Sequence, residues 1–504
     1  MLRKIILGPP GTGKTTKLLA LMEGHLAKGV SSKDIAFLAF TRKAAMEAKA
    51  RAKEKFNLKD EDLPYFKTLH SLAFNFLGVD KKDVMGYVDY MNICQMLGLT
   101  ISSQQIGEDG SFMIVHTKGD RLLFLENLAR ATKTTLEDVW KKFPNDDIHF
   151  AELELLATTL ADYKRVRNKL DFTDMIIRFN FERACPDLAV MILDEAQDLA
   201  PVQWDMIMLL EKRVSYSYMA GDDDQAIYNW AGADVAFFQA LQGETEVLDK
   251  TYRLPMAVFQ KSQEVITQVK HRKPKEFSPE NEHRIGEVKY HNSLESINMK
   301  SGTWFLLARN IYLLNEYSKH CLAQGFLYES KYGNPVTPNA AAAIKYWEML
   351  RKGENVTAAQ AKIVYDFMPV RYGVKFGMKK VLDTLDDSTI LNMETLQKQF
   401  GLVTMDIWHK ALGKLKPYEK QYFIAALQRG EKMMVEPRIK INTIHGVKGG
   451  EADNVVLVTD VSKRTFEEYQ ENPDEELRVW YVGITRARWN LYILHPETPY
   501  FVKI

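Results

Sequence analysis

Cysteines are few and long apolar runs are missing in this sequence. The 504 residues include three cysteines, Cys94, Cys185 and Cys321, which lie far apart with no paired spacing. A disulfide framework or a zinc site is therefore not expected, and a reducing compartment is the better prediction. No apolar stretch approaches the length of a membrane span. The first apolar run is too short for a signal peptide. We expect a soluble, cytoplasmic protein without a membrane partner.

An excess of charge of one sign is also missing. Lys and Arg number 67 and Asp and Glu number 66, which leaves a formal net charge of +1. This balance excludes a uniformly basic nucleic-acid coat, although a basic groove offset by acid elsewhere remains compatible with it. The hydrophobic fraction of 46% is enough for well-packed cores. The length predicts about three or four domains.

A glycine-rich stretch follows the apolar run Ile5–Leu7 close to the start of the chain. Its spacing, Gly8, four residues, then Gly13, Lys14 and Thr15, is that of a phosphate-binding loop ahead of a helix. The predicted nucleotide-binding residues are Gly8, Pro9, Pro10, Gly11, Thr12, Gly13, Lys14, Thr15 and Thr16. A chance glycine-rich turn is the alternative, but strand, loop and helix occur in the order that the motif requires.

The residue types in this loop match the chemistry of a nucleoside triphosphate. Gly11 and Gly13 let backbone N–H groups turn inward toward phosphate oxygens. Lys14 supplies a compact positive charge for the phosphates, and Thr15 offers a hydroxyl oxygen to Mg²⁺. The helix predicted from Lys14 to Ala27 adds its positive N-terminal end. The loop alone indicates a nucleoside triphosphate and nothing more specific.

Two further segments complete a predicted hydrolysis site. The apolar strand 189–193 ends in Asp194 and Glu195, which suit a Mg²⁺ contact and a group that polarises the attacking water. The strand 216–220 precedes Gln225, whose amide both donates and accepts and so suits contact with a γ-phosphate. Without the upstream loop, Asp194 and Glu195 would equally fit an acidic helix start after a strand.

Aromatic residues at strand ends suggest a second ligand. Phe40, Tyr228 and Trp230 all follow predicted strands beside the nucleotide site. Exposed aromatic rings in such places stack on unpaired bases, which is worth about 1–3 kcal/mol for each base. Packing in the core is the alternative for any one of these rings.

The wider pattern predicts an α/β fold. Strands alternate with helices over residues 4–40 and again after residue 189, which is typical of a parallel sheet. Residues 71–169 and about 338–430 are expected to be helical insertions, the first with polar loops near 102–110. The basic run 270–275 is predicted to be a surface loop.

Beyond these features, a series of motifs in order resembles the superfamily 1 DNA helicases of the UvrD/Rep/PcrA type. The matching segments are AFTRKAAMEAKAR at 39–51, TLHSLAFNFL at 68–77, LDFTDMI at 170–176, LDEAQDLAPVQ at 193–203, GDDDQAIYNWAGAD at 221–234, LDKTYRLP at 248–255, INTIHGVKGGEADNVVLV at 441–458 and VWYVGITRAR at 479–488. Residues 78–165 and 311–437 contain no further motif of this series.

The resemblance implies a role for each matching residue. ATP and Mg²⁺ are the implied cofactors, with Lys14 on phosphate and with Thr15 and Asp194 on the metal. Glu195 corresponds to the catalytic base and Gln225 to the γ-phosphate sensor. Arg253 and Arg486 correspond to arginine fingers, and Tyr252 to the ring that stacks on adenine. The residues that resemble the family's DNA contacts are Phe40, Thr41, Thr68, His70, Tyr228, Trp230, Thr443, His445 and Lys448; for the polar ones, helix capping or core hydrogen bonding is the alternative.

The family's architecture implies two RecA-like parallel-sheet domains, each with a mainly helical insertion. The first domain would comprise residues 1–70 and 169–248, with the insertion at 71–168. The second would comprise residues 249–330 and 433–504, with a reduced insertion at 331–432.

The function implied by the resemblance is an ATP-dependent helicase or translocase that moves 3′-to-5′ on single-stranded DNA. Its partners would be single strands, single/double-strand junctions, and replication or repair proteins. Relatives carry an adenine-reading glutamine segment ahead of the loop, which this sequence lacks, so GTP or relaxed nucleotide use stays open. Relatives commonly have Arg after the Trp of the GDDDQ motif, where Ala231 stands here. Two alternatives remain: a translocase that displaces proteins without separating strands, and a nucleotide-gated module that binds nucleic acid, either DNA or RNA.

Overall fold

The computed structural model describes residues 2–102, 117–143, 147–183, 185–331, 338–432 and 435–504. Contacts divide the chain into two compact units. The first comprises Met1–Ile285 and Glu471–Tyr481, and the second comprises Gly286–Gln470 and Val482–Ile504. The domain boundaries implied by the resemblance stay a prediction.

A six-stranded parallel sheet forms the centre of the first unit. Its strand order is β3-β2-β4-β5-β1-β6, and all neighbouring pairs are parallel. The strands are β1 (Leu2–Leu7), β2 (Ile35–Ala39), β3 (Phe66–Thr68), β4 (Val190–Leu193), β5 (Tyr216–Gly221) and β6 (Glu244–Val247). All residues of β2 and β4 are buried, as expected for central strands covered on both faces.

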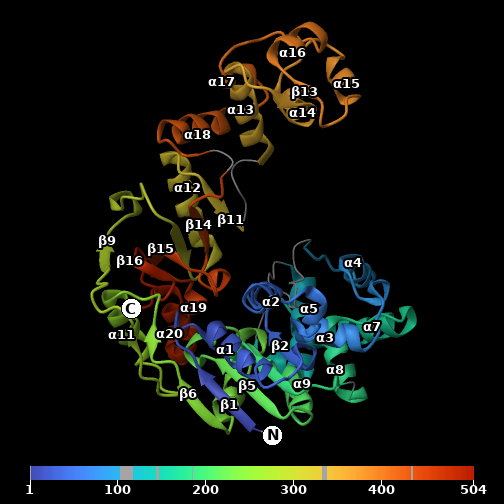
Figure 1. Ribbon diagram of the computed structural model, residues 1–504, viewed down its shortest axis with the longest axis vertical. Helices are drawn as coiled ribbons and strands as arrows, with labels where there is room; N and C mark the ends of the chain where they lie inside the picture. Colours follow the sequence, from blue (N-terminus) through green and yellow to red (C-terminus); the bar gives the residue numbers. More distant parts are fainter. Residues whose placement is uncertain (1, 103–116, 144–146, 184, 332–337, 433–434) are drawn as a thin grey trace. The chain divides into compact units, whose positions relative to one another are not determined.

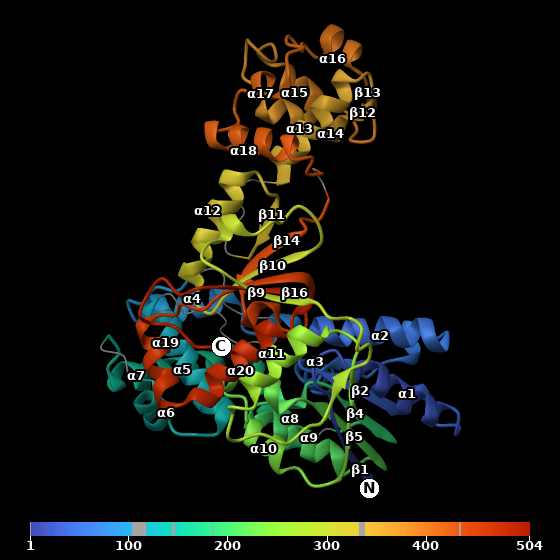
Figure 2. The same ribbon diagram turned by 90° about the vertical axis from the view of Figure 1, so that its left-hand side faces the viewer.

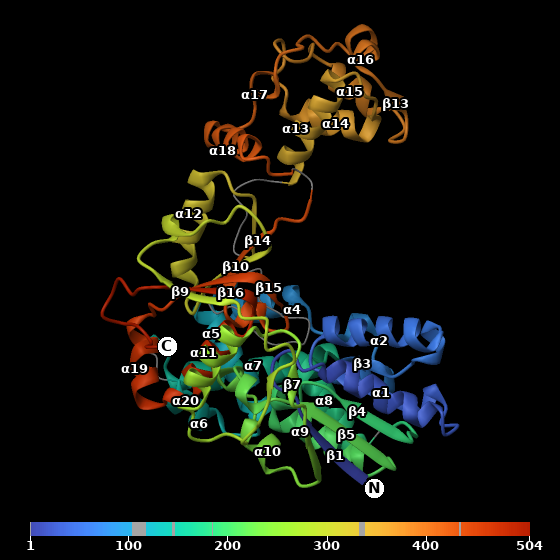
Figure 3. The same cartoon turned by 60° about the vertical axis from the view of Figure 1, so that its left-hand side comes forward.

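Helices cover both faces of this sheet. Side chains of α1 and α2 join one core with Ile6, Phe37 and Ile192, and those of α8 and α9 join the other with Ile5 and Leu38. Figures 2 and 3 show α1 and α2 side by side. The helices are α1 (Lys14–Leu26), α2 (Arg42–Phe56), α3 (Leu69–Phe76), α8 (Phe172–Glu182), α9 (Pro201–Glu211), α10 (Val235–Ala240) and α11 (Met256–Ile266). α20 (Pro473–Ile484) begins in this unit.

The first insertion is helical, as predicted. Its helices are α4 (Tyr87–Met96), α5 (Lys118–Thr132), α6 (Leu136–Lys142) and α7 (Phe150–Arg167), and they enclose a core of their own. Most of the polar loop predicted near 102–110 lies outside the described residues.

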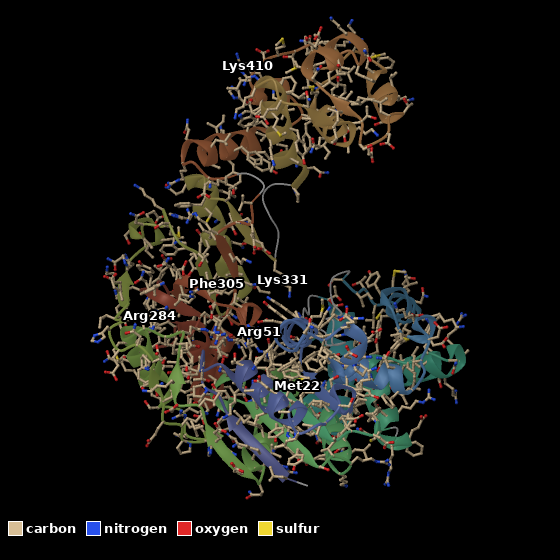
Figure 4. All side chains as sticks on the ribbon, in the orientation of Figure 1. Met22, Arg51, Arg284, Phe305, Lys331 and Lys410 are labelled. Atoms are coloured by element: carbon tan, nitrogen blue, oxygen red, sulfur yellow. The ribbon has the colours of Figure 1, made fainter. Side chains whose placement is uncertain are left out.

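A second six-stranded parallel sheet forms the centre of the second unit. Its order is β11-β14-β10-β15-β16-β9, again with parallel neighbours throughout. The strands are β9 (Glu287–His291), β10 (Trp304–Ala308), β11 (Tyr328–Ser330), β14 (Ile439–Thr443), β15 (Ala452–Val458) and β16 (Ala487–Leu494), with α12 (Leu314–Gln324) and α19 (Lys463–Glu471) as further helices. The apolar segments 304–308, 455–458 and 491–494 predict strands from the sequence, and β10, β15 and β16 lie there. In Figure 4, Phe305 marks β10.

The second insertion is a helical body around the fully buried Trp347. Its helices are α13 (Pro338–Arg351), α14 (Ala358–Phe367), α15 (Met378–Asp383), α16 (Met393–Gln399), α17 (Trp408–Ala411) and α18 (Pro417–Gln428), and β12 (Val356–Thr357) pairs with β13 (Ile390–Leu391). The predicted fold class, two RecA-like parallel-sheet domains with helical insertions, is confirmed. Within the described residues, no helix combines the length and the apolar character needed to cross a bilayer.

One buried histidine makes the stability of the first unit depend on pH. His25 of α1 is 3% exposed and its Nε2 lies 2.7 Å from the hydroxyl of Tyr218 on β5. Burial, with a smaller effect of the Lys28 charge, lowers the pKa of His25 below its usual 6.5. The unfolded chain therefore binds more protons than the folded one just below pH 6.5, and stability falls as the pH falls through that range.

We expect His25→Phe to flatten this pH dependence. The free energy of unfolding of the wild-type protein should decrease between neutral and mildly acidic pH more steeply than that of the variant, as measured by denaturant titration at each pH. His149→Phe, at an exposed position, is the control and should keep the wild-type slope. Equal slopes for the wild type and His25→Phe would contradict the assignment.

Candidate nucleotide site and nucleic-acid interface

The phosphate-binding loop links β1 to α1 and has the backbone that its glycines predict. Gly11 and Gly13 have φ angles of 72° and 78°, in the left-handed region that side chains disfavour. A Cβ on Gly8 would lie 2.0 Å from Cγ of Lys14, so the lysine stem occupies the space that a larger residue would need. The Thr12 hydroxyl donates to the Pro9 carbonyl at 2.8 Å. The loop is thus a tight, glycine-dependent turn at a helix N-terminus.

Lys14 and Thr15 meet the end of β4 in this loop. Lys14 Nζ donates to the Gly8 carbonyl at 3.0 Å and lies 3.7 Å from Oε1 of Glu195. The Thr15 hydroxyl donates to Oδ2 of Asp194 at 3.1 Å. Burial, reinforced by the neighbouring Glu195 charge, raises the pKa of Asp194 to about 6. A nearby cation such as Mg²⁺ would stabilise the charged form of this carboxyl group.

The residues present fit a nucleotide and Mg²⁺. The donor set of Thr15 and Asp194 consists of hard oxygens, which Mg²⁺ prefers. The turn of Gly8–Gly13 with the start of α1 supplies backbone N–H groups of the kind that bind phosphate. This fit rests on the contact between the loop and β4 and is independent of any family likeness.

Glu195 is held in an unusual backbone conformation. Its φ of 55° is left-handed, which costs a residue with a side chain about 1–2 kcal/mol. Its N–H donates to Oδ1 of Asp194 at 2.9 Å, and its Oε2 accepts a hydrogen bond from Gln197 Nε2 at 2.6 Å. These contacts fix the direction of the Glu195 carboxylate.

Gln197 was not singled out from the sequence, yet it connects two parts of the site. It is fully buried, and while Nε2 donates to Glu195, Oε1 accepts from the backbone N–H of Asp222 at 3.0 Å. Asp222 in turn accepts from Nε2 of Gln225 at 2.7 Å through Oδ2. Gln197 lies in the motif LDEAQDL, but only the fold shows that its amide is buried between Glu195 and Asp222.

The segment after β6 docks onto the phosphate loop. Thr251 Oγ1 donates to the Pro10 carbonyl at 2.7 Å, and the N–H of Tyr252 donates to the Gly11 carbonyl at 2.9 Å. A Cβ on Gly11 would lie 2.3 Å from Cβ of Arg253. The structure therefore brings Arg253 beside the loop, while Tyr252 is 63% exposed.

The other predicted arginine finger, Arg486, belongs to the second unit. It is 1% exposed, and its guanidinium donates to the carbonyls of Val482 at 2.9 Å and Gly450 at 3.2 Å. Thr443, at the end of β14, accepts the N–H of Gly446 at 3.2 Å, and His445 and Lys448 follow in the same loop. Their predicted roles stay predictions.

Paired aromatic rings lie beyond the ends of β2 and β5 in the first unit. Phe40 and Tyr228 stack with ring centroids 5.8 Å apart, and Trp230 stacks on Phe124 of α5 at 6.0 Å. All four are partly exposed. Phe124 was not identified from the sequence because it lies in the insertion, where no motif could mark it. One pair lies within the sheet domain, and the other joins the sheet domain to its insertion; we call the two pairs the aromatic surface.

The predicted polar DNA contacts of the first unit begin helices. Thr41 caps α2 by accepting the N–H of Ala44 at 3.2 Å, and Thr68 caps α3 by accepting that of Ser71 at 3.2 Å. His70 is 9% exposed and meets Phe172 edge to face at 5.8 Å. The capping role that the sequence left open is thus observed for both threonines.

Comparison with known proteins matches most of the chain to the helicase family that the motifs resemble. Residues 3–246 match the family described as UvrD/REP helicase N-terminal domain, and residues 379–498 match the UvrD-like helicase C-terminal domain. The chain is 26% identical over 270 residues to an ATP-dependent DNA helicase Rep of Buchnera aphidicola subsp. Baizongia pistaciae, covering 49% of this chain and 38% of the relative. It is 28% identical over 297 residues to an ATP-dependent DNA helicase PcrA of Staphylococcus epidermidis, covering 54% and 39%.

Two parallel-sheet domains, a phosphate loop and this match define a nucleotide-binding protein of the RecA-like type. The chain belongs to the UvrD/Rep/PcrA family of superfamily 1 helicases. A probable DNA helicase of Mycoplasma pneumoniae is a further relative, 26% identical over 285 residues that make up 53% of each chain. The chain matches less than two fifths of the length of the Rep and PcrA relatives.

Proposed function

We propose that this protein is an ATP-dependent motor that moves on single-stranded DNA and separates duplex strands, with ATP and Mg²⁺ as cofactors. The observation that carries the proposal is the meeting of Lys14, Thr15, Asp194 and Glu195 at the carboxyl edge of one parallel sheet. In open α/β sheets, ligands bind at this edge.

Each of these residues has a defined task in hydrolysis. Lys14 and the loop N–H groups would bind phosphate oxygens, and Thr15 with Asp194 would hold Mg²⁺, which would neutralise phosphate charge. Glu195, fixed by Gln197, accepts a proton from the attacking water. Gln225, fixed by Asp222, contacts the γ-phosphate and that water. Arg253, beside the loop, supplies guanidinium charge, and Tyr252 stacks on the base; the role of Arg486 as a second arginine finger rests on its motif alone.

The strand-binding side of the proposal rests on the aromatic surface. Bases would stack on Phe40, Tyr228, Trp230 and Phe124. Thr41, Thr68 and His70 would lie beside the sugar-phosphate backbone of the DNA. In the second unit, Thr443, His445 and Lys448 would contribute further strand contacts. We propose movement in the 3′-to-5′ direction and action at single/double-strand junctions with replication or repair proteins. The names of the Rep and PcrA relatives support a DNA helicase activity, whereas the direction, the junction substrates and the partner proteins rest on the resemblance of the motifs.

A tailed-duplex assay tests strand separation and direction together. We expect ATP-dependent release of the labelled strand from duplexes with a 3′ single-stranded tail and little release with a 5′ tail. Preference for the 5′ tail would overturn the direction. Displacement of streptavidin from biotinylated single strands without duplex separation would favour a translocase, the second candidate, which Ala231 in place of the family's usual arginine supports.

Replacing Trp230 by alanine should weaken single-strand binding. Loss of one stacking ring is expected to cost about 1–3 kcal/mol for the base that it holds. The measurement is fluorescence anisotropy with labelled oligodeoxythymidine. Trp489→Ala, which removes a 46% exposed indole on β16 of the second unit, is the matched control and should bind as the wild type does. Equal affinity for Trp230→Ala and the control would remove Trp230 from the proposed interface.

A further inference from the structure

A cluster of buried charges contacts Gln225 through Asp222. Asp222, Asp223 and Asp224 follow β5 and are 0% exposed. Three consecutive carboxylates without water would cost several kcal/mol each, about the effective penalty for a buried ion, unless cations lie among them. The cations come from the basic run 270–275.

Lys275 is the centre of this cluster. Its side chain is 0% exposed, and Nζ lies 3.0 Å from Oδ1 of Asp222 and 3.0 Å from Oδ2 of Asp224, and forms a hydrogen bond with Asp223. Burial would lower the pKa of Lys275, but the three carboxylates outweigh it and raise the pKa. The lysine thus stays charged, and each of its three N–H donors has one carboxylate to meet. The prediction that residues 270–275 form a surface loop is wrong for Lys275, because three buried carboxylates require a buried cation.

Arg272 and the backbone complete the enclosure. Arg272 forms a two-pronged contact with Asp224, with Nε to Oδ1 at 2.8 Å and a terminal nitrogen to Oδ2 at 2.5 Å. The N–H of Lys273 donates to Oδ2 of Asp223 at 2.7 Å. Arg478 of α20 donates to the Asp223 carbonyl at 3.0 Å and also contacts the His271 carbonyl. Residues from two distant parts of the chain, the run 270–275 and α20, therefore fix the three aspartates.

The two oxygens of Asp222 are divided between Lys275 and the predicted phosphate sensor. Oδ1 faces Lys275 at 3.0 Å, and Oδ2 accepts from Gln225 Nε2 at 2.7 Å. A carboxylate only accepts hydrogen bonds, so Asp222 selects the amide orientation in which the nitrogen faces it. Its backbone N–H also meets Gln197, which holds Glu195. Asp222 therefore links the residues assigned to the water and to the γ-phosphate.

We propose that Lys275 is a positioning residue for ATP hydrolysis, which acts by holding Asp222 so that Asp222 orients Gln225. The proposal rests on the proposed function and deepens it. Lys275 fixes the geometry of the amide and takes no part in binding the nucleotide. Arg272 supports the same arrangement through Asp224.

The segment that carries Lys275 continues into a contact with the other side of the nucleotide loop. Ser278–Pro279 form β8, which pairs in parallel with β7, Lys250–Thr251. Thr251 is the residue that donates to the Pro10 carbonyl. One stretch of about ten residues therefore contains Lys275, which contacts Asp222 beside Gln225, and β8, which pairs with the strand that precedes Arg253.

Lys275→Met keeps the length of the side chain and removes its charge. With Gln225→Ala as reference, we expect both single variants to lower kcat by about 10²-fold, because displacement of a positioned group by about 1 Å has an effect of that order. Binding of a fluorescent non-hydrolysable ATP analogue should change by less than about twofold, as for a loss confined to the transition state. The double variant should be no slower than Gln225→Ala alone, since residues that act as one unit are not additive.

Two further variants separate positioning from general stability. Lys164→Met removes another mostly buried lysine, which pairs with Asp171 and Asp174 in the same unit, and should lower the melting temperature but leave kcat unchanged. Arg272→Lys keeps the charge and loses the fork to Asp224; it should lower kcat about tenfold, again without additivity to Gln225→Ala. If Lys275→Met does not fold, the comparison of Arg272→Lys with the double variant of Arg272→Lys and Gln225→Ala tests the positioning role instead.

The outcomes distinguish the positioning role of Lys275 from the proposed role of Gln225 at the γ-phosphate. If Gln225→Ala is slow but Lys275→Met hydrolyses ATP at the wild-type rate, the positioning role alone is overturned. The same holds if the two effects multiply in the double variant. A Gln225→Ala variant with wild-type kcat would overturn the sensor role of Gln225 and the positioning role together. Non-additive losses with unchanged analogue affinity would establish both.

Discussion

Glu195→Gln is expected to lower kcat for ATP hydrolysis by about 10²–10⁴-fold, the range for loss of a general base. The amide has nearly the same shape as the carboxylate but cannot take a proton from water. The backbone at Glu195 is fixed by its N–H contact to Asp194, so the replacement should keep the left-handed conformation. Nucleotide affinity should therefore stay close to that of the wild type. Steady-state phosphate release and binding of a fluorescent ATP analogue measure the two quantities.

The control for this experiment is Glu47→Gln on α2. Glu47 is exposed and pairs with Arg51 on the same helix. It should leave kcat unchanged, because an exposed ion pair contributes little to stability or structure. A Glu195→Gln variant that keeps more than about a tenth of wild-type kcat would exclude Glu195 as the base.

Arg130→Met is expected to destabilise the first unit by about 3–5 kcal/mol, the usual cost of removing one partner from a buried ion pair. Arg130 of α5 pairs with Glu126 at 2.7 Å, Asp171 at 2.7 Å and Asp174 at 3.0 Å. Burial would raise the pKa of Asp171, but Arg130 and Lys164 outweigh it and hold that pKa well below the usual range. Without Arg130, buried carboxylates are left with too few cations.

Arg178→Met provides the matched comparison. Arg178 also pairs with a glutamate four residues away, Glu182, but both side chains are largely exposed, at 46% and 40%. Its loss should cost less than about 1 kcal/mol. The free energy of unfolding from urea titration measures both. A loss below about 1 kcal/mol for Arg130→Met would show that the network joining the insertion to α8 is not stabilising.

The parts of the molecule that could be predicted from the sequence are those where local spacing determines the chemistry. The phosphate loop was predictable because the positions of Gly8, Gly13 and Lys14 are set by one short turn. Strands β2, β4 and β10 were predictable because central parallel strands are continuous apolar runs. The edge strands β9 and β11 were not, since short, half-exposed strands have no such run.

Contacts between distant segments were beyond the sequence. Phe124 meets Trp230 across more than a hundred residues, and its helix in the insertion carries no motif. Lys275 appears in a run of basic residues that is typical of a solvated loop, and only the fold shows that Asp222 and its two neighbours enclose it. Long-range pairing of this kind has no local signal in a single chain.

The most direct test of the account is the rate of ATP hydrolysis with and without single-stranded DNA. The account predicts slow turnover by the protein alone, clear stimulation by oligodeoxythymidine, and loss of both in Lys14→Ala. A rate that does not respond to single-stranded DNA, or full activity in Lys14→Ala, would contradict a motor in which this phosphate loop drives movement along a strand.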